Sequence, residues 1–245
     1  MYDRAKAILS ALERVVTEPE SQLGLTLTAV AAAANACGFL AVGRFLSHMS
    51  GVVSTMAFHA AAGEVEILLL MAGVFTLFVA GAACSAMIVN EAVRRRYRNV
   101  YIWPLILEAI LLAAYGIGST MALPEWRYDV VIGFSFLMGL QNATITTISG
   151  ARMRTTHITG VVTDIGTEIG RLLYERSGRR VIPSLTSNPY KLVLLLCLVT
   201  SFFLGGVLGV LSFTQIGLLT CVPLALILAV VIMIMHRYYP NRPEK

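Results

Sequence analysis

Charged side chains are scarce in this sequence. Only 13% of its 245 residues are Asp, Glu, Lys or Arg, whereas 57% are hydrophobic. Soluble domains carry about 25% charged residues, so this composition excludes an ordinary soluble enzyme. It also excludes a disordered chain, which needs few apolar and many charged residues.

Residue patterns that hold metals, cofactors or nucleotides are also missing. The four cysteines include no CxxC pair, and there is no HExxH, no GxSxG and no GxxxxGK[ST]. We therefore expect no metal, no cofactor and no enzymatic activity, and no direct use of ATP. The net charge of +5 does not predict nucleic-acid binding, because its placement follows the membrane rule described below.

Apolar stretches of about 20 residues, the length that a helix needs to cross a bilayer, recur along the chain. They predict an all-α polytopic membrane protein with six spans, at 25–46, 67–90, 100–122, 129–150, 191–213 and 216–236. Shorter segments follow the first and fourth spans, at 47–63 and 155–176. Residues 1–24 have an apolar side formed by Ile8, Leu12, Val15 and Val16, which predicts a helix lying in the membrane interface and ended by Pro19.

Lys and Arg side chains fall on one side of this predicted topology. Of the 19 in the chain, all except Arg44 and Arg127 lie on the side of the two termini. Cytoplasmic loops are rich in Lys and Arg, so we expect both termini in the cytoplasm, an external loop at 123–128 and a cytoplasmic tail at 237–245. The expected location is the inner or plasma membrane.

The chain contains a weak internal repeat, with units at 25–122 and 129–236. Its clearest part is a motif, SHMSGVVS at 47–54, that returns as THITGVVT at 156–163. Asn35 and Gly43 match Asn142 and Gly150 at the same spacing. Each unit has three spans, an odd number, so the second unit must enter the membrane from the opposite side. Inverted repeats of this kind are typical of secondary transporters.

The run GLQNA at 139–143, followed by RTTHITG at 154–160, resembles the YoaK family of bacterial and fungal multi-pass membrane proteins of unknown function. The resemblance extends from the first span to the last. The first unit departs from the family pattern, which has Asp in place of Asn35 and Asn in place of Val52. The resemblance implies a membrane protein and brings no activity.

Two interpretations of the repeated motif remain open. Ser and Thr hydroxyls are good N-caps, so each motif is either a helix cap with a packing turn, or a solute site at the start of a half-helix. The residues that we consider as candidates for binding a substrate or ion are Asn35, Ser47, His48, Ser50, Gly51, Glu108, Gln141, Asn142, Thr156, His157, Thr159, Gly160 and Asp164.

Amides and acids inside or near spans need partners. Asn35, Gln141 and Asn142 either join helices or face a central site. Glu108 is expected either to pair with a motif histidine or to reach water near the membrane surface. Asp164 and Glu168 share a helix face: Asp164 is expected to line a path, and Glu168 to lie on a solvated face and pair with Arg171.

A secondary transporter of a small polar solute is the function that these features favour. The alternatives are a channel-like pore, a membrane-embedded enzyme and a scaffold without transport activity. The expected partners are the lipid bilayer and a small polar solute or ion, with no nucleic acid, and the sequence also allows a homo-oligomer.

Overall fold

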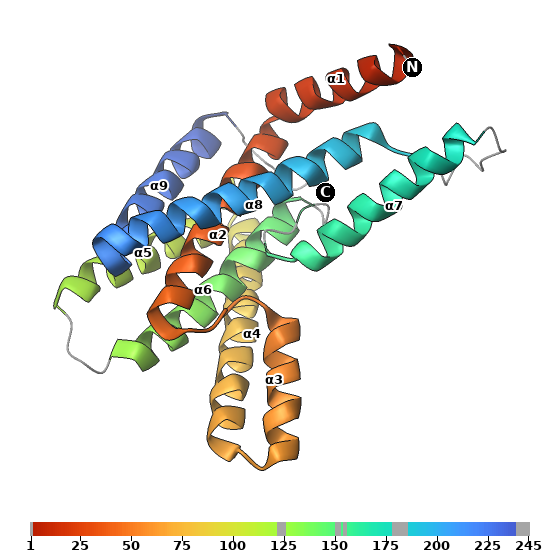
Figure 1. Ribbon diagram of the computed structural model, residues 1–245. Coiled ribbons are helices and arrows are strands. Elements are labelled where there is room, and N and C mark those ends of the chain that lie inside the picture. Colours follow the sequence, from red (N-terminus) through yellow and green to blue (C-terminus); the bar gives the residue numbers. More distant parts are fainter. Residues whose placement is uncertain (1, 122–125, 150–152, 154–155, 178–185, 239–245) are drawn as a thin grey trace.

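The computed structural model describes residues 2–121, 126–149, 153, 156–177 and 186–238. Every regular element in these residues is helical, which confirms the all-α class. In order along the chain (Figure 1) they are α1 (Tyr2–Thr17), α2 (Pro19–Val42), α3 (Met49–Ala62), α4 (Val65–Arg94), α5 (Ile102–Gly118), η1 (Ser119–Met121), α6 (Trp126–Ile148), α7 (Ile158–Arg176), α8 (Pro189–Ile216), η3 (Gly217–Thr220) and α9 (Cys221–Tyr238).

Four helical runs among the described residues are long and apolar enough to cross a membrane. They are Pro19–Val42, Val65–Arg94, Val130–Ile148 and Pro189–Arg237, and the last of them contains both α8 and α9. Gly217 separates these two helices with a φ of 59°, a left-handed conformation that glycine adopts without strain. Helix α5 is apolar but has only 17 residues. Each predicted span thus has a helix, and the number that crosses the membrane stays a prediction.

The start of the bundle agrees with one expectation and differs from another. Helix α1 ends at Thr17, just before Pro19, as expected. Pro19 is also the first residue of α2, which therefore begins six residues before the predicted span. Proline is tolerated there because the first N–H of a helix has no partner within the helix. Helix α1 buries Ala11 and Val15 and packs against α8. Its apolar residues Ile8, Leu12 and Val16 remain exposed, so its contact with a membrane interface stays a prediction.

Long helices of one half of the sequence pack against long helices of the other half. Helix α4 packs along α6, whereas α8 packs along α2, and α5 pairs with α9. Helices α3 and α7 lie beside α4 and α8 and point away from each other (Figure 1). We take α2–α5 as one unit and α6–α9 as the other. The first helix of each unit then packs along the third helix of the other unit: α2 packs along α8, and α6 along α4. Two intertwined units would produce this pattern, and their inversion across a membrane stays a prediction.

Glycines form the closest helix contacts. A Cβ atom on Gly81 of α4 would lie 2.0 Å from the carbonyl oxygen of Phe136 in α6, and one on Gly205 of α8 would lie 2.3 Å from that of Ala29 in α2. Ala29 lies six residues before Asn35, and Phe136 lies six residues before Asn142. These two asparagines are equivalent in the sequence repeat. In lipid no hydrophobic driving force acts between helices, so close packing at small residues such as glycine stabilises their association instead.

Hydroxyl groups join the same helix pairs. Ser85 of α4 and Thr144 of α6 are hydrogen-bonded at 2.8 Å, and Ser201 of α8 donates to the carbonyl of Leu25 in α2 at 2.6 Å. The outward side of α8 is apolar: Phe203, for example, is 67% exposed. Exposed apolar surface of this extent is typical of a face that contacts lipid or a partner.

Candidate functional site

Helices α3 and α7 begin directly after the two motif histidines. His48 and His157 occupy the N-cap positions, and neither makes a side-chain capping bond. The expectation that a motif Ser or Thr caps each helix is therefore wrong. The hydroxyls just before the histidines have other partners, because the chain turns back towards the preceding helix.

Both preceding hydroxyls bind an asparagine of that helix. Ser47 Oγ donates to Asn35 Oδ1 at 2.8 Å, and Thr156 Oγ1 donates to Asn142 Oδ1 at 2.6 Å. Asn142 Nδ2 also donates to the carbonyl of Met138 at 2.7 Å. The asparagines thus tie each motif to the helix that precedes it, and their role at a central site stays a prediction.

The two motifs line one cleft of about 950 Å³, which we call the motif cleft. Its lining combines residues from the two sequence halves: Ser47, His48, Met49, Ser50, Gly51, Phe78, Asn142, Thr156, His157, Ile158, Thr159, Val162 and Thr163. Eight sequence candidates are among them. Asn35 lies behind Ser47, through their hydrogen bond. The sequence reasoning missed Phe78, which belongs to α4 and carries no polar signal.

The cleft offers polar groups without formal charge. Its described lining contains hydroxyls, an amide and two imidazoles, and no Asp, Glu, Lys or Arg. Partial burial lowers the pKa of His48, which favours the neutral imidazole, and the His48 ring packs on that of Phe45 at 4.6 Å between centroids. The first turns of α3 and α7 add backbone N–H groups at positive dipole ends.

Gly160 leaves room for the ring of His157. A Cβ atom on Gly160 would lie 2.4 Å from Nδ1 of His157, whereas one on the repeat-equivalent Gly51 would meet nothing within 4 Å. The absence of a side chain at Gly160 therefore allows the imidazole of His157 to lie against the first turn of α7. Gly51 has no such constraint.

The acidic residues of α7 do not follow the expectation. Asp164 lies outside the cleft lining and forms an ion pair with Lys191 at 3.2 Å, with its side chain 50% exposed. Glu168, expected on a solvated face, is 1% exposed and pairs with Arg171 at 2.9 Å, as predicted. Its second oxygen accepts the N–H of Asn188 at 2.9 Å. Glu168 is buried because the start of α8 covers it, which residue spacing alone does not reveal.

Glu108 and Gln141 are fully buried away from the motif cleft. Neither oxygen of Glu108 has a hydrogen-bond partner in the described part of the chain, so both expectations for it, a histidine partner and contact with water, are wrong. Gln141 Nε2 donates to the carbonyl of Leu27 at 3.4 Å, which joins α6 to α2. Its Oε1 is left without a partner.

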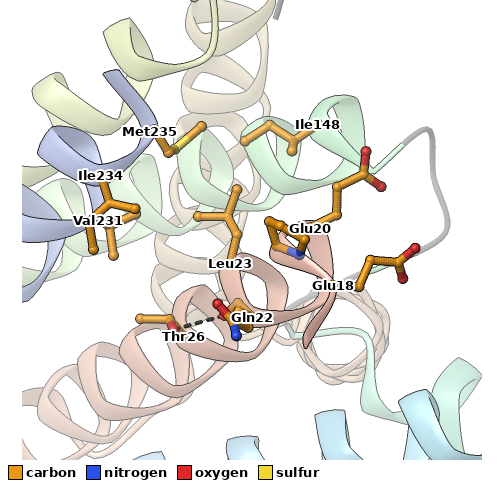
Figure 2. Close-up of a pocket in the computed structure, with 10 residues that line it drawn as sticks. Glu18, Glu20, Gln22, Leu23, Thr26, Ile148, Val231, Ile234 and Met235 are labelled. Atoms are coloured by element: carbon orange, nitrogen blue, oxygen red, sulfur yellow. Dashed lines mark hydrogen bonds between the residues drawn. The ribbon is translucent and has the colours of Figure 1, made fainter. Parts of the chain in front are cut away.

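A second cleft, of about 510 Å³, lies where the start of α2 meets the ends of α6 and α9. Figure 2 shows apolar side chains on the walls, among them Leu23, Ile148 and Met235, with Glu18 and Glu20 at one side. A hydrogen bond from Tyr190 is the main reason why the pKa of Glu18 is lowered. Sequence reasoning missed this cleft because its walls come from three helix ends far apart in the chain.

Comparison with known proteins assigns the family. Residues 23–234 match the model of a protein family described as a protein of unknown function (DUF1275). No curated protein and no solved structure matches the chain. The match agrees with the expectation of a domain of unknown function, although its description does not use the name YoaK. Since the match runs from α2 into α9, the chain belongs to the DUF1275 family of proteins of unknown function.

Proposed function

We propose that this protein carries a small polar solute across a membrane and binds it in the motif cleft. The observation that carries the proposal is that the two copies of one motif, more than 100 residues apart, line a single cleft. Each copy is fixed by an equivalent Ser or Thr to Asn hydrogen bond. Packing alone does not require two equivalent polar turns to line the same open space.

The chemistry of the cleft suits a neutral or weakly anionic solute. Ser50 and Thr159 supply hydroxyls that donate or accept hydrogen bonds, and two helix N-termini supply N–H donors. The lining lacks a formal charge among its described residues, so a strongly charged solute would have no counter-charge. Phe78 and Val162 would contact the apolar part of the solute.

Inverted repeats are part of this proposal. The supporting observations are the exchanged packing of α4 with α6 and of α8 with α2, and the charge bias that puts all but two Lys and Arg residues on one side. In such transporters the site lies between the repeats and opens to either side as they move. The resemblance to YoaK proteins is compatible with the same plan.

Uptake into proteoliposomes tests the function. Purified protein would be screened with neutral and monoanionic polar solutes, and uptake by the wild type would be compared with that of His157→Ala and Asn142→Ala. We expect both variants to lose uptake. His236→Ala is the control, because His236 is exposed at the end of α9 and should keep it. Size-exclusion chromatography would show that each variant is folded, and wild-type uptake by both site variants would contradict the proposal.

Thiol labelling in intact cells tests the topology. A single cysteine at position 125 should react with a membrane-impermeant reagent from outside, and one at position 96 should not. The opposite pattern would overturn the inverted arrangement, because it would reverse the charge bias on which the arrangement rests.

A further inference from the structure

Glu108 lies in the middle of the bundle. At one end of the α5–α9 pair, Asn99 Nδ2 donates to the carbonyl of Met235 at 3.3 Å. At the other end, a Cβ on Gly116 would lie 2.7 Å from Val222. Glu108 falls about midway between these contacts, on the face of α5 that also buries Leu105 and Leu112. Glu108 is thus about 9 Å along the helix from the start of α5 and about 15 Å from its end.

No charge compensates a carboxylate at this place. Both oxygens of Glu108 are buried without a hydrogen-bond partner among the described residues. Helices α4, α6 and α9 pack against α5. On α6 the ionisable residues Arg127, Tyr128 and Asp129 all belong to the first turn, at least 12 residues before Gln141. The ionisable residues on α4, α9 and α5 itself are Glu66, Cys84, Glu91, Arg94, Cys221, His236, Arg237, Tyr238 and Tyr115. None of the described side chains among them is hydrogen-bonded to Glu108.

A second buried oxygen without a partner lies at a similar depth on the neighbouring helix. Tyr115 of α5 lies against Gly133 of α6. Glu108 is seven residues before this contact and Gln141 is eight residues after it, so each is about two helical turns away. The Oε1 of Gln141 lacks a partner among the described residues. A protonated carboxyl group has an O–H that donates a hydrogen bond, and an amide oxygen such as this one can accept it.

We propose that Glu108 is a proton-binding site inside the bundle, and that gain and loss of this proton accompany the conformational change of transport. An isolated carboxylate in an apolar interior costs far more free energy than the neutral acid, so the conformation described here holds the protonated form. Loss of the proton requires a conformation in which water or a cation reaches Glu108. Proton binding and conformation are therefore coupled. The coupling to solute rests on the proposed function, whereas the protonated site does not.

Labelling with dicyclohexylcarbodiimide tests the site itself, because this apolar reagent modifies protonated carboxyl groups. The full-length protein in detergent at neutral pH would be labelled and its peptides identified by mass spectrometry. We expect label on Glu108 and none on Glu168, which is equally buried but ion-paired with Arg171 and so is a matched internal control. Glu108→Gln should lose the label completely. Absence of label on Glu108, or equal label on Glu168, would overturn the proposal.

Fluorescence tests the coupling without any solute. Trp103 lies on α5, five residues before Glu108, and its ring packs on Tyr97 at 4.9 Å between centroids. In a Trp126→Phe background, its emission should show a step with pH that Glu108→Gln abolishes and that Glu66→Gln, an exposed control on α4, keeps. A labelled Glu108 without this step would overturn the coupling. Because neither experiment needs transport, a failure of the proposed function would be seen separately, as absence of uptake.

Discussion

Ser47 donates its hydroxyl to Asn35 Oδ1 at 2.8 Å, across a separation of 12 residues. The bond closes the turn between α2 and α3 and brings His48 to the N-terminus of α3. Thr156 and Asn142 form the equivalent bond at 2.6 Å in the second unit. The two turns are thus built in the same way, and they face the same cleft.

The bond between Thr156 and Asn142 should contribute measurably to stability. Thr156→Val keeps the side-chain shape but removes the hydroxyl that donates to Asn142 Oδ1, which should cost about 1–3 kcal/mol. Thermal unfolding in detergent measures this loss. Thr163→Val is the control, because Thr163 is exposed and its hydroxyl only donates to the carbonyl of Thr159. Equal losses in the two variants would contradict the structural role of the bond.

Gly160 and Gly51 should respond differently to the same substitution. Gly160→Ala forces the imidazole of His157 out of its position, because the new Cβ would lie 2.4 Å from Nδ1. We expect uptake to fall while the melting temperature hardly changes, since the ring can rotate and alanine favours the helix. Gly51→Ala meets no atom within 4 Å, so it should leave the imidazole of His48 in place. Wild-type uptake by Gly160→Ala would show that the position of His157 does not matter.

Neighbouring glycines of α8 offer a matched test of the packing between α8 and α2. In Gly205→Ala the new Cβ would lie 2.3 Å from the backbone oxygen of Ala29, and overpacking of this kind costs about 1–3 kcal/mol. Gly206→Ala meets nothing within 4 Å and should be neutral or slightly stabilising. Unfolding temperatures of the two variants measure the difference. A less stable Gly206→Ala protein would mean that α8 has a different rotation about its axis.

The contact between Glu18 and Tyr190 should make stability depend on acid pH. The hydrogen bond from Tyr190, together with Arg14 and Ser21, holds the pKa of Glu18 below its ordinary value of 4.5. A lowered folded-state pKa stabilises the fold above the ordinary value, and this stabilisation is lost as the pH falls through the folded-state pKa. Tyr190→Phe should therefore reduce the loss of stability below pH 4.5, measured as melting temperature against pH. Identical curves for both proteins would contradict this role.

The sequence predicts the helices of this fold well, because long apolar runs and the repeated motif are local signals. It also predicts that Asn35 and Asn142 are equivalent. It does not predict which hydroxyl each asparagine binds, since that depends on how the turns fold back. The burial of Glu168 depends on Asn188, 20 residues away, and the second cleft on three helix ends. Such features depend on tertiary contacts that residue spacing does not encode.

Modification of the motif cleft tests the central claim most directly. Ser50→Cys and Thr159→Cys would be made separately in a protein without its native cysteines, because these exposed residues come from the two motif copies and both line the cleft. Ser54→Cys, exposed on α3 outside the lining, is the control. A charged methanethiosulfonate reagent should block uptake of a solute identified in the screen at both cleft positions and leave uptake by the control unchanged. Full uptake after complete modification at positions 50 and 159 would contradict the account.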